Sequence, residues 1–116
     1  MLSFSSAVRI YLAVEPVDMR KSFDGLYAVA SEHLKENPLH GGLFVFSNKR
    51  RNRLKILFWD GTGLWVLAKR LEKGAFTWPR GANAAGGKLQ LKSEALSMLL
   101  GGIDLKEGMS KAWYER

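Results

Sequence analysis

Apolar residues recur along this chain with two different periods, which divides it into strands and helices. Residues 8–14 are rich in β-branched and aromatic side chains and end at Glu15-Pro16, so they predict a strand. Apolar residues then follow helical spacing, which predicts a long amphipathic helix capped by Asp18 and ended near Asn37-Pro38. The apolar face of that helix consists of Met19, Phe23, Leu26, Tyr27, Ala30 and Leu34.

Three more strands are predicted at residues 43–47, 53–59 and 64–70, and the last two form a hairpin around residues 60–63. If Trp59 lies opposite Leu64, one face of the hairpin is core: Leu54, Ile56, Phe58, Trp65 and Leu67. The other face carries Arg53, Lys55 and Arg70 at one end and Leu57, Trp59, Leu64 and Val66 at the other.

This pairing places Arg53 opposite Arg70. Like charges across a ladder are unfavourable by about 0.2–1 kcal/mol without a counter-ion. A bound polyanion would remove that cost, and a wider turn that separates the two arginines is the alternative.

The last third of the chain predicts shorter elements. Residues 75–78 are a candidate fifth strand with Phe76 and Trp78 on one side, and residues 88–91 are a short edge strand. The Gly- and Ala-rich stretch between them predicts a mobile loop. Ser93 is expected to cap a short helix that ends at Gly101-Gly102. The sequence therefore predicts an α+β fold with a mainly antiparallel sheet of four to five strands. It forms one domain over residues 1–116, with a core at about 7–104 and a tail at 105–116.

The positive charge of the chain is concentrated in its middle. Eighteen Lys and Arg residues stand against eleven Asp and Glu, for a net charge of +7. Eleven of those cations lie between Lys49 and Lys92, where only Asp60 and Glu72 oppose them, so this segment alone carries +9. Clustered positive charge favours an anionic partner: nucleic acid first, an acidic membrane second and an acidic protein third.

The strongest functional signal is the basic turn at residues 49–53, which runs directly into the hairpin. Guanidinium and ammonium groups bind phosphates, and an aromatic on the charged face, Trp59, can stack on a base or sugar. A solvated basic surface with no partner is the alternative interpretation. We expect nucleic acid to contact Lys49, Arg50, Arg51, Arg53, Lys55, Trp59, Lys69, Arg70, Arg80 and Lys88.

Catalytic motifs are weak. The loop at 81–88 resembles a phosphate loop, but Gly87 stands where its lysine is required. The carboxylates have simpler roles in caps, turns and ion pairs, and neither His33 nor His40 has ligand spacing. We therefore expect no catalytic residue, metal or cofactor, and a metal-dependent nuclease is the outside alternative.

The 116 residues contain no cysteine, which excludes disulfides and thiolate metal sites. No apolar run approaches the roughly 20 residues of a membrane span, and residues 1–6 lack the features of a signal peptide. We expect a cytoplasmic protein with no membrane partner.

Several ordered blocks resemble a known family, the small TnpB-type (Orf2-like) accessory proteins of the insertion-sequence-sixty-six transposons. These blocks are PVDMRKSFDGL at 16–26, GLFVF leading to Asn48, RLKILFWDGTGL at 53–64, KRLEKG at 69–74 and FTWP at 76–79. The resemblance implies a bacterial mobile-element protein that assists transposition beside a separate, larger transposase. It supplies no established catalytic residues.

Two hypotheses follow. The first is a non-enzymatic DNA-binding accessory factor for transposition, with the transposon ends as candidate DNA. The second is a module that docks on the transposase without binding DNA, with Trp59, Leu64 and the Trp113-Tyr114 tail as anchors. Arg20, Lys21 and Asp24, on the exposed side of the predicted helix, are a further candidate interaction surface. RNA as the polyanion, the oligomeric state and the strand order stay open.

Overall fold

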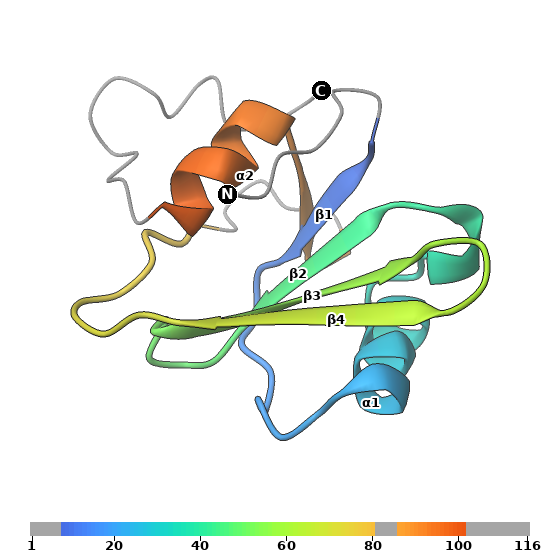
Figure 1. Ribbon diagram of the computed structural model, residues 1–116, viewed down its shortest axis with the longest axis horizontal. Helices are drawn as coiled ribbons and strands as arrows, with labels where there is room; N and C mark the ends of the chain where they lie inside the picture. The colour runs from blue at the N-terminus through green and yellow to red at the C-terminus, as the bar shows by residue number, and fades with distance from the viewer. Residues whose placement is uncertain (1–7, 81–85, 102–116) are drawn as a thin grey trace.

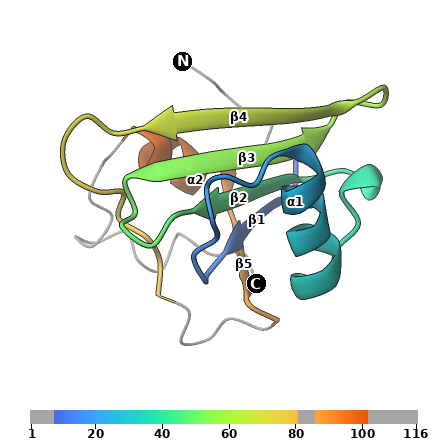
Figure 2. The ribbon, with the colours of Figure 1, turned by 90° about the horizontal axis from the view of Figure 1, so that it is seen from below.

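The computed structural model describes residues 8–80 and 86–101, which form one five-stranded sheet between two helical layers (Figure 1). The strands are β1 (Ile10–Ala13), β2 (Leu43–Ser47), β3 (Arg53–Trp59), β4 (Leu64–Arg70) and β5 (Lys88–Leu91). Their order in the sheet is β4-β3-β2-β1-β5, so β4 and β5 are the two edges (Figure 2). Only β1 and β2 are parallel, because a helical crossover returns the chain between them.

The helices cover opposite faces of the sheet. In Figure 1, α1 (Phe23–Ala28) and its π-helical continuation η1 (Val29–His33) lie below the sheet, and α2 (Ser93–Leu100) lies above it. A short 3-10 helix, η2 (Pro38–His40), leads into β2.

Each face of the sheet has its own core. On the α2 face, Leu54 and Ile56 of β3 pack with Leu96 and Leu99 of α2. On the α1 face, Leu57 packs with residues of β1, β2 and the first helix. All five residues of β2 are buried, because this central strand is covered on both sides.

The structure confirms the strands predicted at residues 43–47, 53–59 and 64–70 and the hairpin, and it places β1 within the strand predicted at residues 8–14. Trp59 pairs with Leu64 and Arg53 with Arg70, so the wider turn that would separate the two arginines is not formed. Residues 88–91 form the expected edge strand, and the α+β fold with a mainly antiparallel sheet is confirmed.

The start of the first helix was predicted wrongly. It begins at Phe23 after Ser22, which makes no side-chain cap, and it ends at His33, before Asn37. Asp18 does not cap it, because the Asp18 carboxylate accepts hydrogen bonds from the backbone N–H and the guanidinium of Arg20 instead. The late start also leaves Phe23, expected on the buried face, 48% exposed.

Three smaller predictions were also wrong. Residues 75–78 form no ladder, although Phe76 is buried and Trp78 packs against the α2-face core. Ser93 is the first residue of α2 and Lys92 precedes it without a side-chain cap. Trp65, predicted to be core, is 51% exposed because it lies beyond the cluster of side chains around α2.

Some predictions fall outside the described residues. These are most of the Gly- and Ala-rich loop, at 81–85, and the tail with Trp113 and Tyr114. Among the helices of the described ranges, none is long and apolar enough to cross a bilayer.

Candidate nucleic-acid interface

The turn between β2 and β3 is held by Asn48. Its side-chain oxygen accepts hydrogen bonds from the backbone N–H groups of Asn52 and Arg53, both at 3.1 Å, and its amide donates to the Asn52 side chain at 2.7 Å. Lys49 and Arg50 lie at the tip of this turn. Both are exposed, and neither has a hydrogen bond or ion pair with the residues that the structure describes.

Arg51, the third cation of the turn, points into the protein. Its guanidinium donates to the Val14 carbonyl at 2.9 Å and lies 5.0 Å from the centre of the Trp78 ring. Burial lowers the pKa of Arg51, while the charge of nearby Glu15 acts in the opposite direction. The backbone of Arg51 is left-handed, with φ 59°, and its carbonyl accepts from Phe76 N–H at 2.6 Å. Arg51 therefore connects the turn to β1 and to the segment after β4.

Four of the expected binding residues line one open hollow of about 480 Å³ at the end of the β3–β4 hairpin. Arg53 and Arg70 face each other across the ladder there. Glu72 is the one carboxylate in its lining and lies 3.6 Å from the Arg70 guanidinium. The hollow is lined by Met19, Arg53, Leu54, Lys55, Ala68, Lys69, Arg70 and Glu72. The Lys69 ammonium points to the opposite face of the sheet, so the charged groups that face the hollow are Arg53, Lys55, Arg70 and Glu72, with a net charge of +2.

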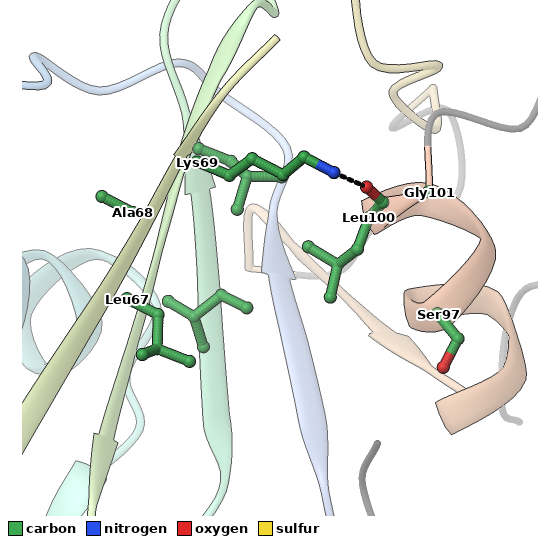
Figure 3. A pocket seen from close by; sticks show the side chains of 8 residues that line it. Leu67, Ala68, Lys69, Ser97, Leu100 and Gly101 are labelled. Carbon is green, nitrogen blue, oxygen red and sulfur yellow. Dashed lines mark hydrogen bonds between the residues drawn. The ribbon is translucent and has the colours of Figure 1, made fainter. Parts of the chain in front are cut away.

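The lysines of this hollow also bind main-chain carbonyls. Lys55 donates to the carbonyls of Met19 and Lys21, each at 2.8 Å, so it holds the segment before α1 against β3. Lys69 donates to the Leu100 carbonyl at the C-terminal end of α2 at 2.5 Å (Figure 3). A cation at this end of a helix is favourable, because the last carbonyls carry partial negative charge.

The other expected residues lie elsewhere. Lys88 is in β5, at the opposite edge of the sheet, where it pairs with Glu36 at 2.6 Å and donates to the Leu34 carbonyl. Arg80 is exposed and follows the buried Pro79. Trp59 is half-buried and ends β3, six residues and about 20 Å from Arg53, so the structure does not bring it to the hollow.

Comparison with known protein families accounts for the five sequence blocks between residues 16 and 79 that resemble one family. The profile of a family described as IS66 Orf2 like protein matches residues 8–110 of this chain. The chain belongs to the IS66 Orf2-like family. Membership confirms the resemblance seen in the sequence and identifies a transposition-associated accessory protein.

Two relatives of this IS66 Orf2-like protein come from Sinorhizobium fredii. Uncharacterized protein y4hO is 41% identical over 104 residues, which are 90% of this chain and 88% of the relative. Uncharacterized protein y4jC is 38% identical over 104 residues, again 90% of this chain and 86% of the relative. No solved structure matches the chain.

Trp65 of the IS66 Orf2-like protein has an exposed indole ring, although the sequence analysis assigned this residue to the core. Its indole N–H donates to the Asp60 carboxylate at 2.7 Å, and its ring stacks on Phe58 with centroids 6.1 Å apart. Asp60 also accepts from Thr62 and from the Gly63 N–H. These bonds, the Trp65 bond first, lower the pKa of Asp60 well below its ordinary value.

The segment before α1 is the other candidate surface of the IS66 Orf2-like protein. Arg20 and Lys21 are exposed, as is Asp24 in the first turn of α1. The side-chain hydrogen bond from Arg20 lowers the pKa of Asp18 to about 2. Met19 of this segment lines the basic hollow, so the two surfaces are continuous. Across the described ranges, no group of three or more His, Asp or Glu side chains is placed to hold a metal.

Proposed function

We propose that this protein is a non-enzymatic DNA-binding accessory factor that acts beside a separate transposase. One observation carries the proposal: the fold gathers Arg53, Lys55 and Arg70 around one hollow, next to the exposed cations of the β2–β3 turn. A phosphate backbone is the polyanion whose repeated charges suit such a surface.

The Arg53–Arg70 pair supports this function. Two guanidiniums directly opposite each other on a ladder repel, and the exposed Glu72 carboxylate, 3.6 Å from Arg70, offsets this only in part. A phosphate between them would accept hydrogen bonds from both and reverse the sign of the interaction. Lys55 can join in, because an ammonium group has three N–H donors and this lysine gives two of them to carbonyls.

Contacts of this kind position a protein on a duplex without reading its sequence. Recognition of transposon ends would therefore depend on the transposase or on groups outside this hollow. We expect the isolated protein to bind a terminal-repeat duplex and a scrambled duplex of equal length with similar affinity.

The test is the salt dependence of binding, followed by fluorescence anisotropy on a labelled duplex. Replacing Lys49, Arg50 and Arg53 together by alanine removes three exposed cations and leaves the structural Arg51 in place. Each lost phosphate contact lowers the slope of log affinity against log salt by about 0.9, so the triple variant should lose about 2.7. The matched control replaces Arg9, Lys35 and Lys92, exposed cations outside the hollow, and should lose much less.

An unchanged slope in a folded triple variant would remove the turn from the interface. Failure of the unaltered protein to bind either duplex at low salt would refute DNA binding altogether. A terminal-repeat preference that persists as salt rises would contradict the expected lack of sequence readout.

A second candidate function is docking on the transposase. The observation that favours it is an apolar groove of about 290 Å³ between β4 and the end of α2, on the face that also carries Trp65 (Figure 3). Co-purification with the transposase after nuclease treatment, without measurable affinity for DNA, would support docking over DNA binding.

A further inference from the structure

The outer edge of β4 is a long backbone edge, and none of the described strands lies beside it. This strand has seven residues, whereas β5 at the other edge has four. Its first five residues, from Leu64 to Ala68, carry no charge. Edge strands are normally protected by charged residues, proline, bulges or a short length. In β4 charge is present only at the last two positions.

The hydrogen bonds at the two ends of the hairpin identify which groups point outward. The Gly63 carbonyl accepts from Asp60 N–H, and Leu71 N–H donates to the Asn52 carbonyl, so odd-numbered residues bond toward β3. In an antiparallel ladder the alternate residues then direct both N–H and C=O away. The outward residues are Leu64, Val66, Ala68 and Arg70, and no backbone bond outside the ladder reaches them from the described residues.

We propose that a second copy of this chain pairs along this edge, β4 against β4, antiparallel and centred on Leu67. In this register Val66 bonds to Ala68 of the partner subunit and Leu64 to Arg70 of the partner subunit. All seven residues overlap, and the eight outward N–H groups of the two strands all find carbonyl acceptors. Two sheets of five strands become one of ten.

The side chains fit the same register. On the α2 face, Leu67 meets the partner's Leu67, and Trp65 meets the partner's Lys69. The aliphatic stem of a lysine packs well on an indole, and its ammonium group is attracted to the ring. No like charges lie directly opposite, whereas a shift that centred the pair on Lys69 or Arg70 would oppose two cations.

The Trp65 side chain is exposed but already held in one orientation, which suits it to such a contact. It is 51% exposed, yet its indole is held by the Asp60 hydrogen bond and by stacking on Phe58. A side chain that is already ordered loses little entropy when it is buried, which is the property of an interface anchor.

Other registers that also pair outward residues with outward residues form fewer backbone hydrogen bonds between the two β4 strands. Centring on Val66 or Ala68 leaves an end of each β4 without a β4 partner. Odd shifts fail because they place the inward-bonded residues of one copy against the outward residues of the other. The register centred on Leu67 is therefore the one that satisfies the whole edge.

The first test is sedimentation velocity of the full chain over a range of concentrations. We expect a reversible dimer, and we expect Trp65→Thr to raise its dissociation constant by at least about tenfold, as for an aromatic anchor. The control is Phe23→Thr, which changes another aromatic of similar exposure, 48%, on α1, and should leave the constant unchanged.

The second test fixes the geometry. Because the chain has no cysteine, Leu67→Cys introduces a single thiol on the two-fold axis. Residue 67 would form a non-hydrogen-bonded pair with itself, with Cα atoms about 4.5 Å apart, which is within the range of a disulfide. A mild oxidant should convert this variant rapidly to a covalent dimer, while Val66→Cys and Ala68→Cys should react slowly.

A chain that stays monomeric at every concentration would overturn the proposal. So would a dimer in which Leu67→Cys, shown to be folded by circular dichroism, does not crosslink. Rapid crosslinking of Val66→Cys or Ala68→Cys in its place would overturn the register. These results are independent of DNA affinity, which the salt titration measures separately.

Discussion

Adjacent arginines in the β2–β3 turn have different physical roles. Arg50 is exposed and has no partner among the described residues, whereas Arg51 is half-buried on Trp78 with a backbone carbonyl as acceptor. The left-handed backbone at Arg51 turns its side chain toward β1. Counting both as phosphate contacts, as composition suggests, overestimates the charge that the turn presents.

Arg51→Ala should therefore lower stability more than it lowers DNA affinity. It removes a charged hydrogen bond and a cation–π contact, offset in part by the desolvation of a half-buried charge. We expect the free energy of unfolding to fall by about 1–2 kcal/mol in urea denaturation. Arg50→Ala is the control and should leave it unchanged within about 0.5 kcal/mol. Equal stability of the two variants would contradict a structural role for Arg51.

Asp18 gives a prediction about pH. Hydrogen bonds from Arg20 lower its pKa from 3.8 to about 2, so the charged carboxylate is favoured in the folded state. Its stabilising contribution is complete above about pH 4 and is lost as the pH falls toward 2. A side-chain NMR titration should place its midpoint near pH 2.

Arg20→Ala should raise that midpoint toward 3.8 without reaching it, because the backbone N–H of residue 20 remains a donor. A midpoint that does not move in the variant would rule out the Arg20 side chain as the main cause.

At the scale of elements, the register of the β3–β4 hairpin has two opposing effects on stability, apolar burial and charge repulsion. Its register buries Leu54, Ile56 and Leu57 but forces Arg53 and Arg70 together. Apolar burial contributes several kcal/mol, whereas the repulsion costs less than about 1 kcal/mol. The register therefore holds, and an anion bound between the two arginines would relieve the repulsion.

Arg53→Thr should separate these effects. Without DNA we expect it to stabilise the protein by about 0.2–1 kcal/mol at low salt, less as salt screens the pair, while DNA affinity falls. Thermal unfolding at several salt concentrations and anisotropy on the same samples measure both. Arg80→Thr removes an exposed charge outside the ladder and should show no such gain in stability. A loss of stability in Arg53→Thr would show that the arginines do not repel in the free protein.

At the scale of the whole molecule, the structure separates the basic surface from the exposed apolar surface. The Arg53–Arg70 pair and Met19 lie on the α1 side of the hairpin, whereas Trp65 and the groove beside Leu100 lie on the α2 side. The β4 edge runs between them. Pairing along that edge about a two-fold axis normal to the sheet keeps both basic hollows on one face. DNA binding and self-association are thus compatible in one molecule.

The hairpin, its register and the basic segment could be predicted because they follow from local patterns in the sequence. The alternation in residues 53–59 and 64–70 gave the hairpin and its register, and the charge count gave the basic segment. The family blocks also lie in the sequence itself, and the match over residues 8–110 confirms them. Periodicity and composition are properties of neighbouring residues, so they need no knowledge of the fold.

Only the tertiary structure decided which of those side chains are buried and which form hydrogen bonds with distant segments. The alternation of apolar residues places Trp65 on the core face, but α2 does not cover it and it is exposed. Asp is a common helix-capping residue, but the Asp18 carboxylate accepts a hydrogen bond from Arg20 instead. Lys55, Lys69 and Lys88 bind carbonyls contributed by segments more than thirty residues away. Burial and hydrogen bonding depend on what the chain brings back against a residue. That return path, including the parallel pairing of β1 with β2, is set by the packing of two helices on opposite faces of one sheet.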